Sequence, residues 1–243
     1  MKIFTALLLL LSMSANAGQV TLTAEDGFKL YGDYYAGQTN KPGVLMLHQC
    51  NGERSMYDNL GKKLAKQGIH AFSLDFRMYG DSVTDTVNMQ KIRASAADRQ
   101  SGRAEIMKHR ALWPADVLLA EQFLREKIGK NAPLGVIGAS CGGGQAITLA
   151  GRKSVDALMF FSSGMDQATL DKYSKLKSTP TFIIAAEGDN YTFKSAQQLF
   201  KNSSHAQNRL VNYKGEGHGI PLFKQDPNLA DTMVGWFVQR LAL

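Results

Sequence analysis

Along most of this 243-residue chain, short apolar runs alternate with segments in which apolar residues recur at helical spacing. A proline or glycine precedes several of the apolar runs. Pro42, Pro133 and Pro180 each precede such a run, which indicates the start of a strand. Strands that alternate with helices predict a mostly parallel sheet with helices on both faces. Ligands of such sheets bind beyond the carboxyl ends of the strands. Functional residues are therefore expected just after each apolar run.

The chain after residue 17 is expected to form a single α/β domain, residues 18–243, because 44% hydrophobic content supplies one sizeable core. The turn dipeptide at Asp26 and Gly27 favours an antiparallel hairpin over residues 20–36. Asp226 as a cap and Pro227 at the first helical position predict the start of a closing helix. Further strands are expected at 43–47, 69–74, 134–137, 157–161, 181–185 and 209–213, and helices at 55–67, 113–128, 146–150 and 193–200.

Residues 81–112 interrupt this alternation with a polar stretch rich in Ser, Asp, Arg and Ala. Connections of this length are usually functional or disordered. The stretch could therefore form a small cap or lid of helices, and a solvated excursion without a role is the alternative.

The first 17 residues have the pattern of a secretory signal peptide. Lys2 precedes an apolar run from Ile3 to Leu11, and the segment ends in Ala15, Asn16 and Ala17. The run is about half the roughly 20 residues that a membrane span needs. We expect cleavage after Ala17 and export to the bacterial periplasm or the medium, with no stable membrane anchor.

Charge and residue clusters limit the expected partners. The formal net charge is +7, and Lys and Arg are scattered among acids rather than gathered in one run, which argues against a nucleic-acid partner. No His, Cys, Asp or Glu cluster has the spacing of metal ligands, so no metal and no cofactor are expected. A small-molecule substrate is the expected partner.

Residues 138–142 read Gly-Ala-Ser-Cys-Gly, a GxSxG motif that follows an apolar strand and precedes a helix. The flanking glycines permit a sharp strand-to-helix turn that exposes the hydroxyl of Ser140. A helix N-terminus also offers backbone N–H groups to a developing oxyanion. Ser140 is therefore the candidate nucleophile, and a plain glycine turn is the alternative.

A carboxylate and a histidine follow two later strands. Asp189 comes after the run 181–185, and His218 lies between glycines after the run 209–213. In this order the histidine can act as the general base and the aspartate can orient its ring. Glu187 and Asp166 remain alternative acids, and His48 a less favoured second base.

The order Ser140, Asp189, His218 resembles the α/β-hydrolase superfamily over residues 20–240. The loop 48–52 looks like the oxyanion loop of that superfamily, so the resemblance implies an oxyanion hole built from the backbone N–H groups of Cys50 and Cys141. In its compact size and in the run 138–143, the chain is most similar to the dienelactone hydrolase group. That group commonly has a cysteine in the central position of the pentapeptide, where this chain has Ser140.

Cys50 and Cys141 are the two cysteines of the chain, and both fall in loops assigned to the oxyanion hole. An even pair in an exported protein can form a disulfide. Two reduced residues that pack beside the nucleophile are the alternative.

These motifs predict an exported serine hydrolase that cleaves an ester or a related activated acyl bond of a small or medium-sized substrate. A peptidase or thioesterase of the same fold is an alternative, and so is a catalytically silent binding protein, because fold alone does not imply function. A metal hydrolase is a weaker third possibility.

Overall fold

The computed structural model describes residues 17–176 and 178–241. The predicted signal peptide therefore lies outside the described residues, except for its last residue. Eight strands form one sheet in the order β1-β2-β4-β3-β5-β6-β7-β8. Their bounds are β1 (Gly18–Thr23), β2 (Lys29–Tyr35), β3 (Gly43–Leu47), β4 (His70–Leu74), β5 (Leu134–Ala139), β6 (Ala157–Phe161), β7 (Thr181–Ala186) and β8 (Arg209–Tyr213).

The sheet is parallel from β4 to β8 and antiparallel at β1 and β2. This arrangement confirms the predicted fold class, a mostly parallel sheet with an N-terminal hairpin. Each of Pro42, Pro133 and Pro180 stands one residue before a strand. Their carbonyl oxygens accept hydrogen bonds from residues of neighbouring strands, so these prolines join the ladder as acceptors only.

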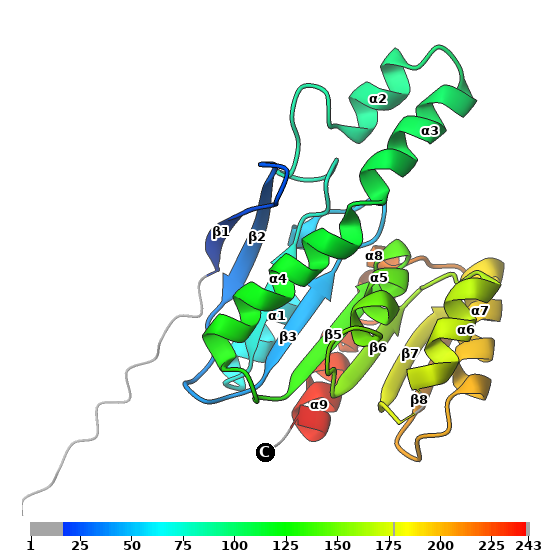
Figure 1. Ribbon diagram of the computed structural model, residues 1–243. Helices are drawn as coiled ribbons and strands as arrows, with labels where there is room; N and C mark the ends of the chain where they lie inside the picture. The colour runs from blue at the N-terminus through cyan, green and yellow to red at the C-terminus, as the bar shows by residue number, and fades with distance from the viewer. Residues whose placement is uncertain (1–16, 177, 242–243) are drawn as a thin grey trace, which may run out of the picture.

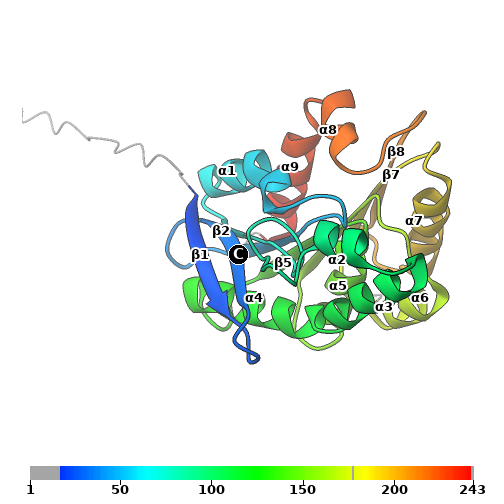
Figure 2. The same ribbon diagram turned by 90° about the horizontal axis from the view of Figure 1, so that it is seen from above.

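Helices cover both faces of the sheet (Figures 1 and 2). One apolar cluster packs the helices α4, α5, α6 and α7 against one face of the sheet. A second cluster packs α1, α8 and α9 against the other face. Alternate residues of β3 point to opposite clusters, Val44 to the second and Leu45 to the first. The helices are α1 (Asp58–Lys66), α2 (Met89–Ser95), α3 (Arg99–Arg110), α4 (Trp113–Ile128), α5 (Cys141–Ala150), α6 (Gln167–Tyr173), α7 (Asn190–Asn202), α8 (Ile220–Gln225) and α9 (Leu229–Leu241), with short 3₁₀ turns η1 (Arg54–Tyr57) and η2 (Ser174–Leu176).

The polar stretch 81–112 contains the helices α2 and α3, which project from the top of the molecule in Figure 1. Asn88 caps α2 through its side chain, and Asp98 and Ser101 form a capping box at the start of α3. We call these two helices and the turn between them the α2–α3 hairpin.

The sequence analysis missed two short helices and misplaced the start of the last one. The helices α6 and α8 were not predicted, and α9 starts at Leu229 rather than behind Pro227. The carboxylate of Asp226 accepts hydrogen bonds from Asn228 N–H and Tyr213 Oη. Asp226 thus holds a turn before α9. None of the helices in the described part of the chain is long and apolar enough to span a membrane.

Candidate active site

Ser140 lies at the junction of β5 and α5 in a strained backbone conformation. Its φ is +50° and its ψ is −117°, a combination that costs an L-residue about 1–3 kcal/mol. A side chain on Gly138 would collide with the backbone of Gly142, and one on Gly142 would collide with the carbonyl of Leu47. Both glycines therefore permit the sharp turn that sets the serine at the N-terminus of α5.

Asp189 and His218 lie together at the same edge of the sheet. Asp189 follows β7, His218 follows β8, and Oδ2 of the aspartate is 2.6 Å from Nδ1 of the histidine. Side-chain exposure is 20% for Asp189 and 36% for His218. Because the carboxylate accepts the proton on Nδ1, the neutral ring leaves Nε2 without a proton and able to act as a base.

Hydrogen bonds link both the turn at Ser140 and the loop of His218 to the end of β6. The amide of Ser140 donates to Phe161 O at 2.9 Å, and Gly219 N–H donates to the next residue's hydroxyl, Ser162 Oγ, at 3.0 Å. Within the described residues, Ser140 Oγ makes no hydrogen bond to His218. Such bonds are often long before substrate binds and tighten in the Michaelis complex.

The two alternative acids have other partners. Asp166 accepts from Thr169 N–H at the start of α6, which lowers the pKa of Asp166 through hydrogen bonds to the Thr169 side chain and backbone. Glu187 accepts from Asn212 Nδ2 at 3.3 Å. Of the three candidate acids, the structure brings Asp189 to His218.

Cys50 and Cys141 are joined by a disulfide, with their Cα atoms 5.7 Å apart. Of the two states that the sequence left open, the structure contains the bonded one. The backbone N–H groups of Cys50 and Cys141 have no acceptor within the described part of the protein. The bond therefore keeps the two loops that carry these N–H groups together, and the oxyanion hole stays a prediction.

Three side chains that the sequence analysis missed support this arrangement. Thr192 Oγ1 donates to Asp189 Oδ2, the oxygen that also accepts from His218. Gln49 Oε1 accepts from Ile220 N–H at 3.2 Å, which links the loop after β3 to the loop that carries His218. Ser162 bonds Gly219, as described above. The one signal for these contacts in the sequence was Thr192. It stands three residues after Asp189 near the start of a helix, which is a common position for capping contacts.

His48 has a structural role next to this site. Its Nδ1 lies 2.7 Å from Gln49 O, and Phe76 N–H donates to its Nε2 at 3.0 Å. The ring is therefore neutral with its proton on Nδ1. Its side chain is completely buried, and burial lowers the pKa of His48 to about 4. This histidine orders the loop after β3, and His218 remains the candidate base.

The buried neutral ring of His48 predicts a loss of stability in acid. Unfolding restores an ordinary pKa near 6.5, so the contribution is complete above that pH and is lost as the pH falls towards 4, by about 3 kcal/mol. The difference in unfolding free energy between wild type and His48→Gln should shrink by this amount between pH 7 and pH 4. Urea unfolding at both pH values measures it, and a constant difference would contradict the prediction.

Two cavities open near the site. One of about 440 Å³ is lined by Asp189, His218 and the neighbouring loop residues. The other, of about 500 Å³, lies against Cys50, Asn51 and Gly52 in the loop after β3. Among the described residues, no group of three or more His, Cys, Asp or Glu side chains could hold a metal ion.

A family model that describes the dienelactone hydrolase family matches residues 32–230. The chain belongs to the dienelactone hydrolase family. This membership confirms the resemblance seen in the sequence, places the protein in the α/β-hydrolase superfamily and makes it a hydrolase. A search among curated proteins finds no match to the chain.

Solved structures of a dienelactone hydrolase and of two esterases share the fold at low sequence identity. A dienelactone hydrolase from Anabaena variabilis is 16% identical, with a TM-score of 0.68 over 94% of this chain and 100% of that one. An esterase from Pyrococcus furiosus is 16% identical, with a TM-score of 0.71 over 94% of each chain. The esterase domain of a Rhodothermus marinus protein is 15% identical, with a TM-score of 0.67 over 93% of this chain and 100% of that one.

Proposed function

We propose that the protein is a serine hydrolase that cleaves an ester or a related activated acyl bond of a small or medium-sized substrate. The observation that carries the proposal is the strained turn at Ser140, which sets a hydroxyl at the N-terminus of α5, at the carboxyl end of the sheet that also carries the Asp189–His218 pair. Strain of this kind persists where the surrounding structure enforces it, and it is common at active sites.

The chemistry follows from the positions of these groups. Nε2 of His218 takes the proton of Ser140 as Oγ attacks the carbonyl carbon, and it returns that proton to the leaving group as the acyl-enzyme forms. Asp189 holds Nδ1–H and stabilises the protonated ring. The N–H groups of Cys50 and Cys141 receive the oxyanion. Water then repeats the sequence on the acyl-enzyme.

A fluorophosphonate probe tests the nucleophile. The probe should label wild type and Cys141→Ala but not Ser140→Ala, because only an activated serine displaces its leaving group. Intact mass after labelling gives the stoichiometry, and circular dichroism checks that the variants are folded. Labelling that survives Ser140→Ala and disappears in Cys141→Ala would contradict the serine assignment. A folded wild type without any labelling would favour the catalytically silent alternative.

We also propose that the protein is exported after removal of residues 1–17. Two observations support this. The strand β1 begins at Gly18, directly after the expected cleavage site, and the chain contains a disulfide, a bond that persists in oxidising compartments. Mass spectrometry of the protein from a bacterial periplasmic extract should give the mass of residues 18–243, and an uncleaved chain in the cytoplasm would contradict export.

A further inference from the structure

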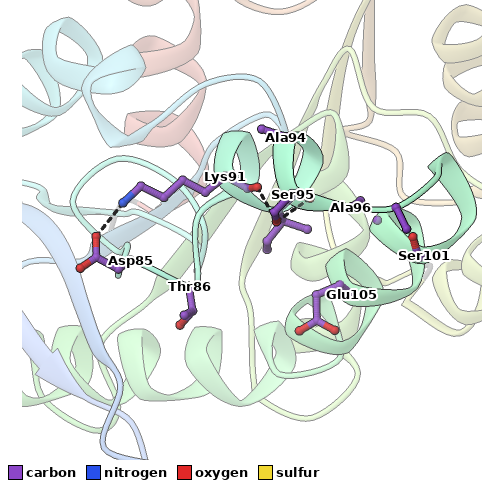
Figure 3. A pocket seen from close by; sticks show the side chains of 11 residues that line it. Asp85, Thr86, Lys91, Ala94, Ser95, Ala96, Ser101 and Glu105 are labelled. Atoms are coloured by element: carbon purple, nitrogen blue, oxygen red, sulfur yellow. Dashed lines mark hydrogen bonds and ion pairs between the residues drawn. The ribbon is translucent and has the colours of Figure 1, made fainter.

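The two sides of the α2–α3 hairpin differ in how their charges are matched. On one side, a cavity of about 770 Å³ is lined by residues that include Asp85, Lys91 and Glu105 (Figure 3). Lys91 Nζ lies 2.6 Å from Asp85 Oδ1, and Glu105 is paired with Lys108 at 2.7 Å. The charges on this side are thus matched by neighbouring side chains, and nothing here calls for a charged ligand.

The other side carries a cavity of about 780 Å³ with an excess of positive charge. We call it the arginine pocket, and its charged lining residues are Arg93, Arg99, Arg103, Arg110 and Asp98. The carboxylate of Asp98 accepts from Ser101 N–H at 2.7 Å as the cap of α3. Across the part of the chain that the structure describes, none of the four guanidinium groups forms an ion pair with a carboxylate.

Helical geometry gathers three of these four arginines on one face of α3. Arg99, Arg103 and Arg110 are four and seven residues apart in turn, which places them within an arc of about 40°. Ile106 and Met107 flank them on the same face, and Met107 is 52% exposed. Like charges at such spacing repel one another. An anionic ligand with a short apolar part would therefore match this surface in both charge and polarity.

The arginine pocket adjoins the candidate active site. Nη2 of Arg110 lies 3.0 Å from Sγ of Cys50, the residue whose disulfide leads to Cys141 beside Ser140. Arg93 lines both this pocket and the cavity against the loop after β3. A molecule held by these arginines would thus extend towards the proposed oxyanion hole.

We propose that the arginine pocket binds a phosphate-class group, with an adjoining apolar segment against Ile106 and Met107. Guanidinium groups bind phosphate oxygens in pairs, and several of them together suit an anion with several oxygens. The assignment of a substrate class rests on the proposed function. The substrate would then be an ester that carries such a group a short distance from the scissile bond.

Binding of hexyl phosphate to the Ser140→Ala protein tests the pocket separately from hydrolysis. Calorimetry should show binding of hexyl phosphate and none of hexanol. Arg99→Gln/Arg103→Gln should weaken the binding at least about tenfold, because charge-assisted hydrogen bonds are lost. The control Lys62→Gln/Arg152→Gln removes the same charge from exposed positions outside the hairpin and should stay within about twofold.

Binding to lipid vesicles distinguishes a lipid headgroup from a soluble molecule as the source of the phosphate group. Sedimentation with phosphatidylglycerol vesicles, against phosphatidylcholine vesicles, shows whether a lipid headgroup occupies the pocket, and calorimetry with hexyl phosphate shows whether a soluble molecule does. Either signal supports the pocket if it is lost in Arg99→Gln/Arg103→Gln and kept in the control variant. Absence of both, or an equal loss in the control, overturns it. Since both measurements use Ser140→Ala, they stand whether or not the serine is the nucleophile.

Discussion

His218→Ala is expected to lower kcat for a chromogenic ester by roughly 10⁴- to 10⁶-fold, which is the range found when the base of a serine hydrolase is removed. The ring of His218 is held at 2.6 Å by Asp189 with Nε2 available, and its loop is attached to the end of β6 through Ser162. Without the imidazole, Ser140 has no base to take its proton. Steady-state kinetics with p-nitrophenyl acetate measures the loss.

A matched variant and a milder one make this test specific. His205→Ala, in the turn before β8 and so at the opposite end of this strand from His218, should keep activity near that of wild type. Asp189→Asn should lose activity by about 10⁴-fold, because an amide can favour the wrong tautomer of the ring. The proposed mechanism is wrong if His218→Ala retains most of the activity while remaining folded.

Loss of the disulfide is expected to lower the free energy of unfolding by about 4 kcal/mol. The bond spans a sequence separation of 91 residues, and the entropy that a cross-link removes from the unfolded chain grows with loop length. Urea unfolding of Cys50→Ala, Cys141→Ala and the double variant under non-reducing conditions measures the effect. Reduced wild type should unfold like the double variant.

The pattern among these variants separates the bond from packing. Either single substitution already breaks the bond, so each should lose nearly as much as the double variant, and the losses should not add. Additive losses would mean that the two side chains act as separate packing residues. Alkylation before intact-mass measurement gives a second check, since two free thiols in unreduced protein would contradict the bond.

The central strands were predictable from sequence because each is buried on both faces. The run Gly43–Leu47 and the run Ala157–Phe161 begin and end where the sequence indicates. The helices α6 and α8 were missed because seven and six residues give too little periodicity for recognition. The start of α9 was misplaced because Asp226 and Pro227 resemble a helix start but form a turn whose carboxylate binds Tyr213.

The candidate site was predictable where a side chain follows directly from a strand end. Asp189 and His218 are such residues, and the structure pairs them, although their catalytic roles stay predictions. Gln49 and Ser162 were not predictable, because each contacts a backbone N–H more than fifty residues away. The arginine pocket was missed for another reason: its cations lie close together in the sequence, but the bounds of α2 and α3 were not predicted within the polar stretch 81–112.

The disulfide also closes a covalent ring, and the whole α2–α3 hairpin lies inside it. A protease that cuts an exposed bond of the hairpin would therefore leave two fragments linked through Cys50 and Cys141. Such a nicked molecule would migrate as one species without reductant and as two with it. The ring would thus let the protein carry a projecting segment without losing either half of the fold when that segment is cut.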